Sequence, residues 1–587
     1  MNFRTHSCGE LNASQVGLEV SIAGWVARVR DLGGLVFADV RDRYGKTQVV
    51  FDKSEEMSRL GRSLHPEDVV QVTGIVRPRP DDMINRNMKT GEIEVTAEVV
   101  NILSRSNTLP ILVEDEEEPG EELRLRYRFL DLRRPRMQVN LLLRHKSLQS
   151  VRRFHDEEGF VEIETPFLIR STPEGARDYI VPSRIHKGSG YALPQSPQLY
   201  KQALMIGGMD RYFQLARCFR DEDLRRDRQP EFTQIDVEMS FVDEEDVFQH
   251  TEAMMKRLFK DVLGIDIAVP FLRMDYDKAI DEYGSDAPDL RYELLIKRCD
   301  EFFRDSGFKA FESVLERGGG VFGICAHGKA GLSRKNREEL EELARKEGLA
   351  GLLSTPFRDD GLTGILAKIF SAEKQQELIR HFNASSDDLL MFAAGEKAET
   401  LASLGRLRRI LATDWQLIPE NRFEFCWVVN PPLFEPDETG SGLTAVHHPF
   451  TSPVYKDIEK LQMQPIEVRA RSYDLVLNGV EIATGSIRIH DPAIQEAVFA
   501  AIGIDREDAR HRFGFLLEAM DYGAPPHGGI ALGFDRLVML MARELSIRNV
   551  IAFPKTNVAS SLMDGAPAQL DAVQLGELGL KLITPEE

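Results

Sequence analysis

The chain has 587 residues, enough for about four domains at the usual size of roughly 150 residues each. Its 74 Lys and Arg stand against 95 Asp and Glu, and the resulting net charge of −21 argues against a protein that coats nucleic acid indiscriminately. The five cysteines are isolated, with no CxxC pair or Cys/His cluster, so neither a disulfide framework nor a zinc site is expected. The absence of a signal-peptide pattern and of a long apolar run predicts a cytoplasmic protein without membrane spans.

The first hundred or so residues are predicted to form a small β-barrel. A helical segment, Ser54–Leu64, falls between the third and fourth of five strand-like segments, which is the order of an OB-fold. Strand order alone leaves two uses open, binding of single-stranded nucleic acid or packing only. The predicted strands are Val20–Arg30, Leu35–Arg41, Thr47–Phe51, Val69–Val76 and Ile93–Leu103.

After the barrel, changes of composition indicate further domains. An acidic run, a Pro-Gly step and a basic segment with many arginines suggest a hinge at residues 107–135. Strands and helices then mix over residues 136–285, and polar clusters return over residues 416–555. Between these parts, residues 286–415 differ in character and are interpreted as an inserted domain, while residues 556–587 form a weakly patterned tail.

Four segments carry polar residues where strands normally bury apolar ones. In the predicted strand Phe232–Phe241, alternation places Gln234, Asp236 and Glu238 on one face, which lines either solvent or a site. The preceding loop contains four arginines, among them Arg220, whose planar groups suit phosphate oxygens. A solvated hairpin with internally paired charges is the more ordinary reading of that loop taken alone.

The second segment is a predicted hairpin around Asn478-Gly479, the strongest short hairpin signal. Its two-residue turn pairs Val476 with Glu481 and makes Asp474 and Glu481 diagonal neighbours on one face. Two adjacent carboxylates repel unless a cation joins them, so a magnesium site and a water-exposed face are both compatible with the pattern. Simple alternation puts Arg488 on the opposite face, unless a bulge near Gly485 restores it.

The remaining two segments are less specific. In GGIALGFDR, Gly-rich backbone can approach a ligand, and Arg536 begins a helix where the helix dipole disfavours a cation, which suggests a bound anion. In the fourth segment Glu174, Gln198 and Lys201 are polar groups among apolar ones. His447-His448 has no third ligand at a suitable spacing, so a His-only metal site is not expected.

Together these segments closely resemble bacterial-type aspartyl-tRNA synthetases over essentially the whole chain. GFVEIETPFL, with Pro166, resembles the first class II synthetase motif, FRDED…RQPEFTQIDVEMSF the second, and GIALGFDR the third. TPEGARDY, QSPQLYKQ and HHPFTSP resemble strings of the aspartate enzyme, and the insertion resembles the GAD-like domain of the bacterial subgroup.

The resemblance implies a multidomain α+β fold. It comprises an OB-fold anticodon domain at residues 1–106, a class II antiparallel sheet of six or seven strands flanked by helices, and an inserted α+β domain. The implied function is that of an aspartate–tRNA ligase, which forms aspartyl-adenylate from L-aspartate and ATP, releases pyrophosphate, and transfers aspartate to the terminal adenosine of tRNA(Asp). The implied cofactor is Mg²⁺, with no zinc, and the implied assembly is a homodimer.

The resemblance also assigns roles to residues. Arg220 would contact the α-phosphate and the substrate carboxylate, Glu222 would hold the adenine, Phe232 would stack on it, and Arg536 would bind the γ-phosphate. Asp474 and Glu481 would hold magnesium, and Lys201 with Arg488 would take the side-chain carboxylate of aspartate. The amino group would meet Asp236 and Gln198, while Glu174 and His447 or His448 close the pocket. The remaining ATP-binding candidates are Asp221, Gln229, Gly533, Phe534 and Asp535.

In the barrel, Arg30, Phe37 and Gln48 match anticodon readers of the family. Leu32 stands where relaxed enzymes often have His, which favours specificity for tRNA(Asp); the alternative is an enzyme that also charges tRNA(Asn). Two further alternatives were weighed: a synthetase for asparagine or lysine should lack the Lys201/Arg488 pair, and an inactive RNA-binding paralogue should have lost Arg220, Glu481 or Arg536. All of these residues are present.

Overall fold

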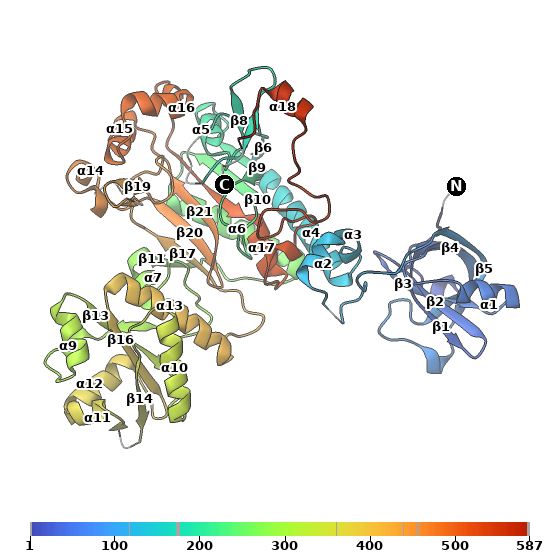
Figure 1. The fold of residues 1–587 in the computed structure, drawn as a ribbon, viewed down its shortest axis with the longest axis horizontal. Coiled ribbons are helices and arrows are strands. Elements are labelled where there is room, and N and C mark those ends of the chain that lie inside the picture. Colours follow the sequence, from blue (N-terminus) through green and yellow to red (C-terminus); the bar gives the residue numbers. More distant parts are fainter. Residues whose placement is uncertain are drawn as a thin grey trace. The chain divides into compact units, whose positions relative to one another are not determined.

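The computed structural model describes residues 3–116, 118–171, 176–359, 361–437, 439–454 and 457–583. Two compact units make up the chain (Figure 1). The first contains residues 1–144 and 548–569, and the second contains residues 145–547 and 570–587.

The first unit contains a closed five-stranded barrel with the strand order β1-β2-β3-β5-β4. Neighbouring strands are antiparallel except β3 and β5, and α1 (Glu55–Arg62) lies between β3 and β4 in sequence. The hydroxyl of Ser54 caps α1 by accepting from the Met57 amide, as its residue type favours. The predicted OB-fold is therefore confirmed. The strands are β1 (Glu19–Leu32), β2 (Leu35–Asp42), β3 (Gly45–Phe51), β4 (Val69–Pro78) and β5 (Ile93–Ser104).

The basic segment after the barrel forms α2 (Glu121–Arg126) and α3 (Arg128–Asp131). Arg128 is buried, donates to Asp131 and to the carbonyls of Arg548 and Ile551, and so is committed within the unit. Arg133 donates to the buried Glu67 at 2.9 Å. Some of the positive charges that cluster here in the sequence are therefore engaged in contacts within the protein.

The main sheet of the second unit has eight strands in the order β11-β17-β20-β21-β22-β10-β9-β6. All inner pairs are antiparallel, while the edge pairs β11–β17 and β6–β9 are parallel, so the sheet is larger than the implied six or seven strands and is mixed at its edges. The strands are β6 (Val161–Glu162), β9 (Arg211–Phe219), β10 (Glu231–Ser240), β11 (Leu272–Asp275), β17 (Phe425–Val429), β20 (Ser472–Leu477), β21 (Val480–Ile487) and β22 (His527–Gly533).

Helices and small hairpins accompany this sheet (Figure 1). No helix in the described ranges is long and apolar enough to cross a membrane. The helices are α4 (Pro135–Glu157), α5 (Gln198–Ile206), α6 (Glu244–Leu263), α7 (Tyr276–Tyr283), α14 (Lys460–Met463), α15 (Pro492–Ala501), α16 (Arg506–Met520), α17 (Phe534–Met541) and, in the tail, α18 (Ala572–Leu578). The hairpins are β7 (Ile180–Pro182) with β8 (Gly190–Ala192) and β18 (Phe434–Pro436) with β19 (Leu443–Ala445).

A buried aromatic layer joins α4, α6 and the sheet. The ring of His155 stacks on Phe213 with centroids 4.4 Å apart, and it lies 5.2 Å from the ring of His250. Burial lowers the pKa of His155 to about 4 and that of His250 to about 3, the latter with help from the charge of neighbouring groups. Both rings are therefore neutral parts of the core near pH 7.

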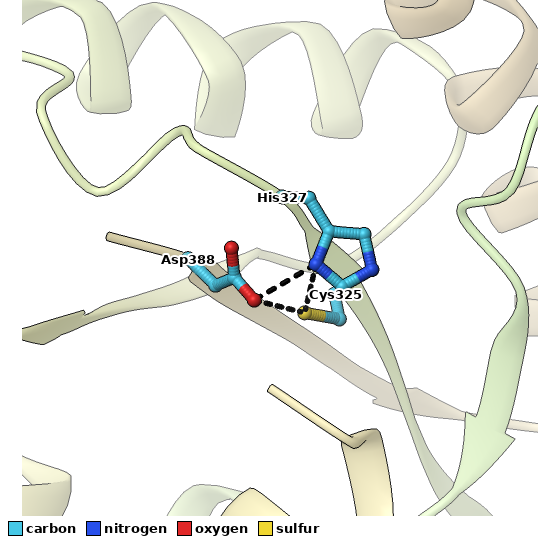
Figure 2. A group of neighbouring side chains, drawn as sticks. All are labelled: Cys325, His327 and Asp388. Atoms are coloured by element: carbon cyan, nitrogen blue, oxygen red, sulfur yellow. Dashed lines mark hydrogen bonds and ion pairs between the residues drawn. The ribbon is translucent and has the colours of Figure 1, made fainter. Parts of the chain in front are cut away.

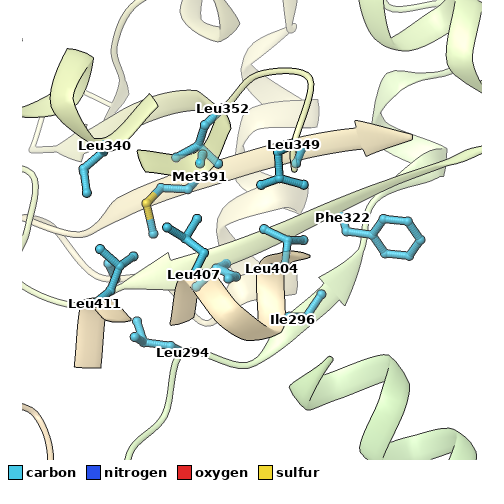
Figure 3. Packing of buried hydrophobic residues seen from close by; sticks show 14 of the residues in the cluster. Leu294, Ile296, Phe322, Leu340, Leu349, Leu352, Met391, Leu404, Leu407 and Leu411 are labelled. Atoms are coloured by element: carbon cyan, nitrogen blue, oxygen red, sulfur yellow. The ribbon is translucent and has the colours of Figure 1, made fainter. Parts of the chain in front are cut away.

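Between β11 and β17 in sequence, a separate five-stranded sheet has the order β12-β13-β16-β14-β15. Successive residues of β13 and β16 point to opposite faces of the sheet and pack into two separate hydrophobic cores. One core is covered by α10 and α13, and the other by α8, α9, α11 and α12. Figure 3 shows Leu404, Leu407 and Leu411 of α13 packed with Phe322 and Met391 of the sheet. The elements are β12 (Ile296–Arg298), α8 (Asp300–Phe303), α9 (Lys309–Glu316), β13 (Gly320–Ala326), α10 (Arg334–Lys346), β14 (Leu353–Arg358), β15 (Gly361–Leu362), α11 (Leu366–Ile369), α12 (Ala372–Phe382), β16 (Leu389–Gly395) and α13 (Lys397–Asp414).

Candidate active site

A cavity of about 430 Å³ opens on the main sheet. Its walls come from α5, the loop between β9 and β10, strands β10, β21 and β22, the start of α17 and the segment containing His447 and His448. The predicted residues that it brings together are Gln198, Lys201, Arg220, Glu222, Gln229, Phe232, Asp236, His447, His448, Glu481, Arg488, Gly533, Asp535 and Arg536.

Four buried charged side chains cluster at one end of the cavity, and all but Glu238 line it. Lys201 Nζ lies 2.6 Å from Asp236 Oδ1 and 3.3 Å from Glu238 Oε2. Arg488 binds Glu238 with two nitrogens, Nε at 2.8 Å and Nη2 at 3.0 Å. The two cations are thus balanced by two carboxylates, as buried charges require.

Glu238 was not singled out as a site residue in the sequence, although alternation along β10 placed it on the polar face. Burial opposes its ionisation, but the charges of Arg488 and Lys201 outweigh burial and lower its pKa to about 2. Glu238 therefore stays ionised and fixes both cations. The same alternation put Phe241 in the strand, but β10 ends at Ser240, and Phe241 is exposed with a φ of 60°.

The pKa of Asp236 is shifted in the opposite direction from that of Glu238. Burial raises its pKa above the ordinary value, although Lys201 acts in the opposite direction. Its Oδ2 atom has no hydrogen-bond partner within the described residues, and neither does Gln198 Nε2 or His447 Nε2. Buried polar atoms without partners lower the stability of the fold unless a ligand forms hydrogen bonds with them. This end of the cavity is therefore suited to a polar ligand.

His448 stands beside the buried charges. Arg488 Nη1 donates to its Nε2 at 2.8 Å, which requires that nitrogen to be unprotonated. Burial, reinforced by the charge of Arg488, lowers the pKa of His448 well below its usual value and that of His447 to about 4. Both imidazoles are therefore neutral near pH 7 and contribute hydrogen bonds, not charge.

The other end of the cavity combines an aromatic ring with arginines. The guanidinium of Arg220 lies over the ring of Phe232, 5.1 Å from its centroid, across the β9–β10 hairpin. Glu222 accepts from Arg228 at 3.3 Å in the loop of that hairpin. A flat ring beside a planar cation suits a purine base and its phosphates.

Arg536 occupies the first turn of α17, as predicted, where the helix dipole disfavours a cation. Its Nη1 donates to the Glu481 carbonyl at 3.0 Å, and Nη2 lies 3.1 Å from Asp227. The guanidinium is thus held in the cavity wall by neighbours on the β9–β10 loop and on β21.

The face of β21 on which Arg488 lies depends on a bulge, a possibility that the sequence left open. Val476 pairs with Glu481 as expected, but the register then shifts, and Asp474 pairs with Thr484 instead of Ala483. The bulge therefore lies at Ile482, not Gly485, and it places Glu481 on the same face as Thr484 and Arg488.

This geometry fits a divalent cation. Burial raises the pKa of Asp474 well above its usual value, and the charge of Glu481 raises it further. Asp474 Oδ1 is buried with no hydrogen-bond partner among residues that the structure describes. Mg²⁺ would satisfy this buried oxygen of Asp474, with the half-exposed carboxylate of Glu481 as its second hard oxygen donor.

Three predicted residues lie apart from the cavity wall. Asp221 pairs through its backbone with Arg177, and Phe534 is fully buried in the core. Asp474 does not line the cavity and pairs with Thr484 across β20 and β21. Glu174 lies outside the described residues. Asp535, which does line the cavity, accepts from the Thr233 amide at 2.8 Å and so joins α17 to β10.

The barrel brings its predicted residues together on one outer face. Arg30 pairs with Phe37 across β1 and β2, and its Nη2 donates to Gln48 Oε1 at 3.0 Å and to Asp39 at 2.7 Å. The ring of Phe37 is partly exposed beside them. Leu32, at the end of β1, is 66% exposed. A partly exposed ring flanked by polar groups can stack an unpaired base.

Comparisons with known proteins agree with this arrangement. Residues 120–557 match the family model described as tRNA synthetases class II (D, K and N), and residues 20–103 match the OB-fold nucleic acid binding domain. A protein named aspartate–tRNA(Asp/Asn) ligase from Bacillus mycoides is 49% identical over 587 residues, which cover 100% of this chain and 99% of that protein. The chain belongs to the aspartate–tRNA ligase family of class II synthetases.

The similarity to this family extends along the full length of the synthetase. A relative of the same name from Bacillus cytotoxicus is also 49% identical, with 99% of this chain and 100% of that protein covered. Among solved structures, the asparaginyl-tRNA synthetase of Pyrococcus horikoshii in complex with asparaginyl-adenylate has a TM-score of 0.59 at 19% identity, covering 94% of this chain and 98% of that one. The aspartyl-tRNA synthetase of Entamoeba histolytica has a TM-score of 0.58 at 19% identity, covering 94% and 91%. At such identities these structures show a shared fold alone.

Proposed function

We propose that the synthetase activates L-aspartate with ATP and then transfers the aspartyl group to the terminal adenosine of tRNA(Asp). The observation that carries this proposal is the cavity with a buried Lys201/Arg488 pair at one end and the Arg220/Phe232 pair at the other. The first end suits a carboxylate, and the second suits a nucleotide.

The activation step requires precise positioning of aspartate and ATP more than it requires acid–base catalysis. The α-carboxylate of aspartate is already ionised at pH 7 and is itself the nucleophile that attacks the α-phosphorus of ATP, with pyrophosphate as leaving group. Two anions must be held in line, and charge on the α-phosphate must be neutralised as the new bond forms. Arg220 is proposed to do both, and Phe232 to hold the adenine.

Magnesium is proposed to be held by Asp474 and Glu481, on the strength of the unpartnered Asp474 oxygen described above. When bound with ATP, the ion supplies positive charge to the phosphate oxygens. Arg536, anchored by Asp227 and Glu481, is proposed to hold the γ-phosphate, which explains a cation in the first turn of α17.

Selection of aspartate over asparagine is proposed to rest on charge. Lysine has three donors, and Asp236 and Glu238 engage two of those on Lys201, which leaves one for the substrate. The amide of asparagine would put an NH2 donor where a carboxylate oxygen accepts from Lys201 or Arg488, and leaving that donor unsatisfied costs about 1–3 kcal/mol. The unpartnered oxygen of Asp236 and the amide of Gln198 are proposed to receive the substrate's amino group.

The tRNA specificity has a second candidate. Leu32 favours charging of tRNA(Asp) alone, whereas the relatives at 49% identity carry names that include both tRNA(Asp) and tRNA(Asn). The two tRNA transcripts should therefore be charged in parallel. Aspartylation of tRNA(Asn) at a rate close to that of tRNA(Asp) establishes the second candidate, and its absence establishes the first.

We propose a homodimer and a cytoplasmic location because the chain resembles this family. The segment that matches the first class II motif exposes Val161, Phe167 and Leu168 to 49%, 50% and 53%, an apolar surface that a second copy of the chain would cover. Light scattering of the purified chain tests the assembly, and a mass of one chain would refute it.

The activity is tested by ATP–pyrophosphate exchange with aspartate, asparagine and lysine in parallel. Exchange with aspartate alone is the expected result. Exchange with asparagine or lysine would favour a different synthetase, and no exchange with any of the three would favour an RNA-binding paralogue.

A further inference from the structure

Cys325, His327 and Asp388 meet at one end of β13 and β16, two inner strands of the five-stranded sheet, and lie far in sequence from the residues of the active site. Strands β13 and β16 pair Cys325 with Leu390 and Ala326 with Leu389, so the next position along brings residue 327 opposite residue 388. Figure 2 shows the three side chains pointing toward one another. The sulfur of Cys325 lies 3.9 Å from His327 Nδ1 and 3.7 Å from Asp388 Oδ2, and Nδ1 lies 2.8 Å from that oxygen.

These separations are close to those around one zinc ion. Zn–S bonds near 2.3 Å and Zn–N or Zn–O bonds near 2.1 Å in a tetrahedron put the ligand atoms about 3.4 to 3.6 Å apart. Two of the three observed distances agree to within a few tenths of an ångström. The third, between His327 Nδ1 and Asp388 Oδ2, must open by about 0.6 Å, which a rotation of the half-exposed imidazole can supply.

The ligands are held in place by other contacts. Asp388 Oδ1 accepts from the Gly328 amide at 2.9 Å, and Oδ2 accepts from the Ser385 amide at 2.8 Å. The other ring nitrogen of His327, Nε2, lies 3.3 Å from Glu293 Oε2. A carboxylate on the second nitrogen is the usual partner of a metal-bound histidine, because it fixes the tautomer and leaves the first nitrogen's lone pair free for the metal.

His327 Nδ1 lies at hydrogen-bond distance from Asp388 Oδ2, so a metal ion bound between these two atoms would replace that hydrogen bond. Burial raises the pKa of the Cys325 thiol to about 12, and the charge of Asp388 raises it further, so the free thiol is protonated and binding of a metal must release its proton.

We propose that the inserted domain binds one Zn²⁺ ion through Cys325 Sγ, His327 Nδ1 and Asp388 Oδ2, with the fourth position open to solvent. A thiolate with an imidazole selects zinc over Mg²⁺, which prefers oxygen donors only. No zinc site was expected from the sequence because no CxxC pair or Cys/His cluster was recognised, and Asp388 lies 61 positions from His327. Bound zinc would join the end of β13 to the segment 385–388 and stabilise this domain, independently of the proposed aminoacylation.

The test uses the full chain without a histidine tag, stripped by a chelator and free of nucleotide. Zn²⁺ is titrated against a chromophoric competitor, with excess Mg²⁺ present. One equivalent should bind. Co²⁺ in place of Zn²⁺ should give a thiolate-to-cobalt charge-transfer band in the near ultraviolet.

The variants separate this site from others. Cys325→Ser should abolish the charge-transfer band, and His327→Gln, at a half-exposed position that folding tolerates, should weaken zinc binding by more than about tenfold. Cys299→Ser is the matched control, because Cys299 is equally buried in the same domain but outside the cluster, and it should bind as the parent does. Failure of the parent to bind zinc, binding that survives in both Cys325→Ser and His327→Gln, or a cobalt complex without the thiolate band would each overturn the proposal.

Discussion

Replacing Lys201 with Met removes one charge from the buried end of the cavity while keeping the length of the side chain. The ammonium group is 2% exposed and lies 2.6 Å from an oxygen of Asp236, which is fully buried. Breaking such a pair leaves a carboxylate without its partner and typically costs about 3–5 kcal/mol of folding stability. Urea unfolding of the variant should show a loss of this size at pH 8.

The loss should depend on pH in a predictable direction. Burial already raises the pKa of Asp236, and removal of the Lys201 charge raises it further. A raised pKa in the folded state means that folding takes up a proton, so stability returns as pH falls through that pKa. The stability gap between the variant and the parent should therefore narrow from pH 8 to pH 5.

Activity is expected to fall for a separate reason. If Lys201 binds the side-chain carboxylate of aspartate, its removal should cost about 2–5 kcal/mol of transition-state stabilisation, or roughly 30-fold to a few thousand fold in kcat/KM. ATP–pyrophosphate exchange with aspartate measures this quantity. The KM for ATP should change little, because the nucleotide end of the cavity is untouched.

The double variant Lys201→Met with Asp236→Asn separates the two effects. It removes one cation and one anion together, so no buried charge is left alone, and most of the lost stability should return. Exchange activity should not return with it. Recovery of both stability and aspartate-dependent exchange in the double variant would refute a substrate-binding role for Lys201 and leave it a structural one.

Three further predictions follow from the same structure. Arg536→Ala should reduce exchange by about 100-fold or more while tRNA binding measured by filter retention stays nearly unchanged; loss of both together would count against its role at the γ-phosphate. Stability should decline as pH falls from about 6.5 to about 4, because the folded state keeps His155 neutral while the unfolded chain takes up a proton, a contribution of up to about 3 kcal/mol; His155→Phe should flatten this decline in urea midpoints, and an unchanged slope would contradict the reasoning. Phe37→Ala should weaken tRNA binding by about 1–3 kcal/mol without affecting exchange in the absence of tRNA, and an equal loss in exchange would argue for general damage.

Local patterns in the sequence were sufficient for the barrel and for the individual strands that carry the site. Alternation along β10 predicted that Asp236 and Glu238 share a face, because the two-residue period of a strand is a property of the backbone itself. The Asn478-Gly479 turn likewise predicted the pairing of Val476 with Glu481. Specific strings identified the family, from which the candidate residues of the cavity were taken.

Local patterns did not predict register shifts or pairings between distant segments. The bulge at Ile482, which brings Glu481 and Arg488 to one face, depends on how β21 fits between β20 and β22, and no residue of β21 alone encodes that choice. The composition of the basic segment suggested a hinge, but it did not predict that Arg128 donates to carbonyls of a segment more than four hundred residues away.

The balance of charges shows the same division. The sequence by itself determined that the chain is an acidic, multidomain synthetase and which residue types its cavity contains. Only the tertiary structure decided that Lys201 and Arg488 are neutralised by Asp236 and Glu238, and that Cys325, His327 and Asp388 converge beside the five-stranded sheet. Residue types and the short-range period of a strand or helix can be read from the local sequence. Burial, pKa and ligand geometry depend instead on which distant groups the folded chain places within a few ångströms.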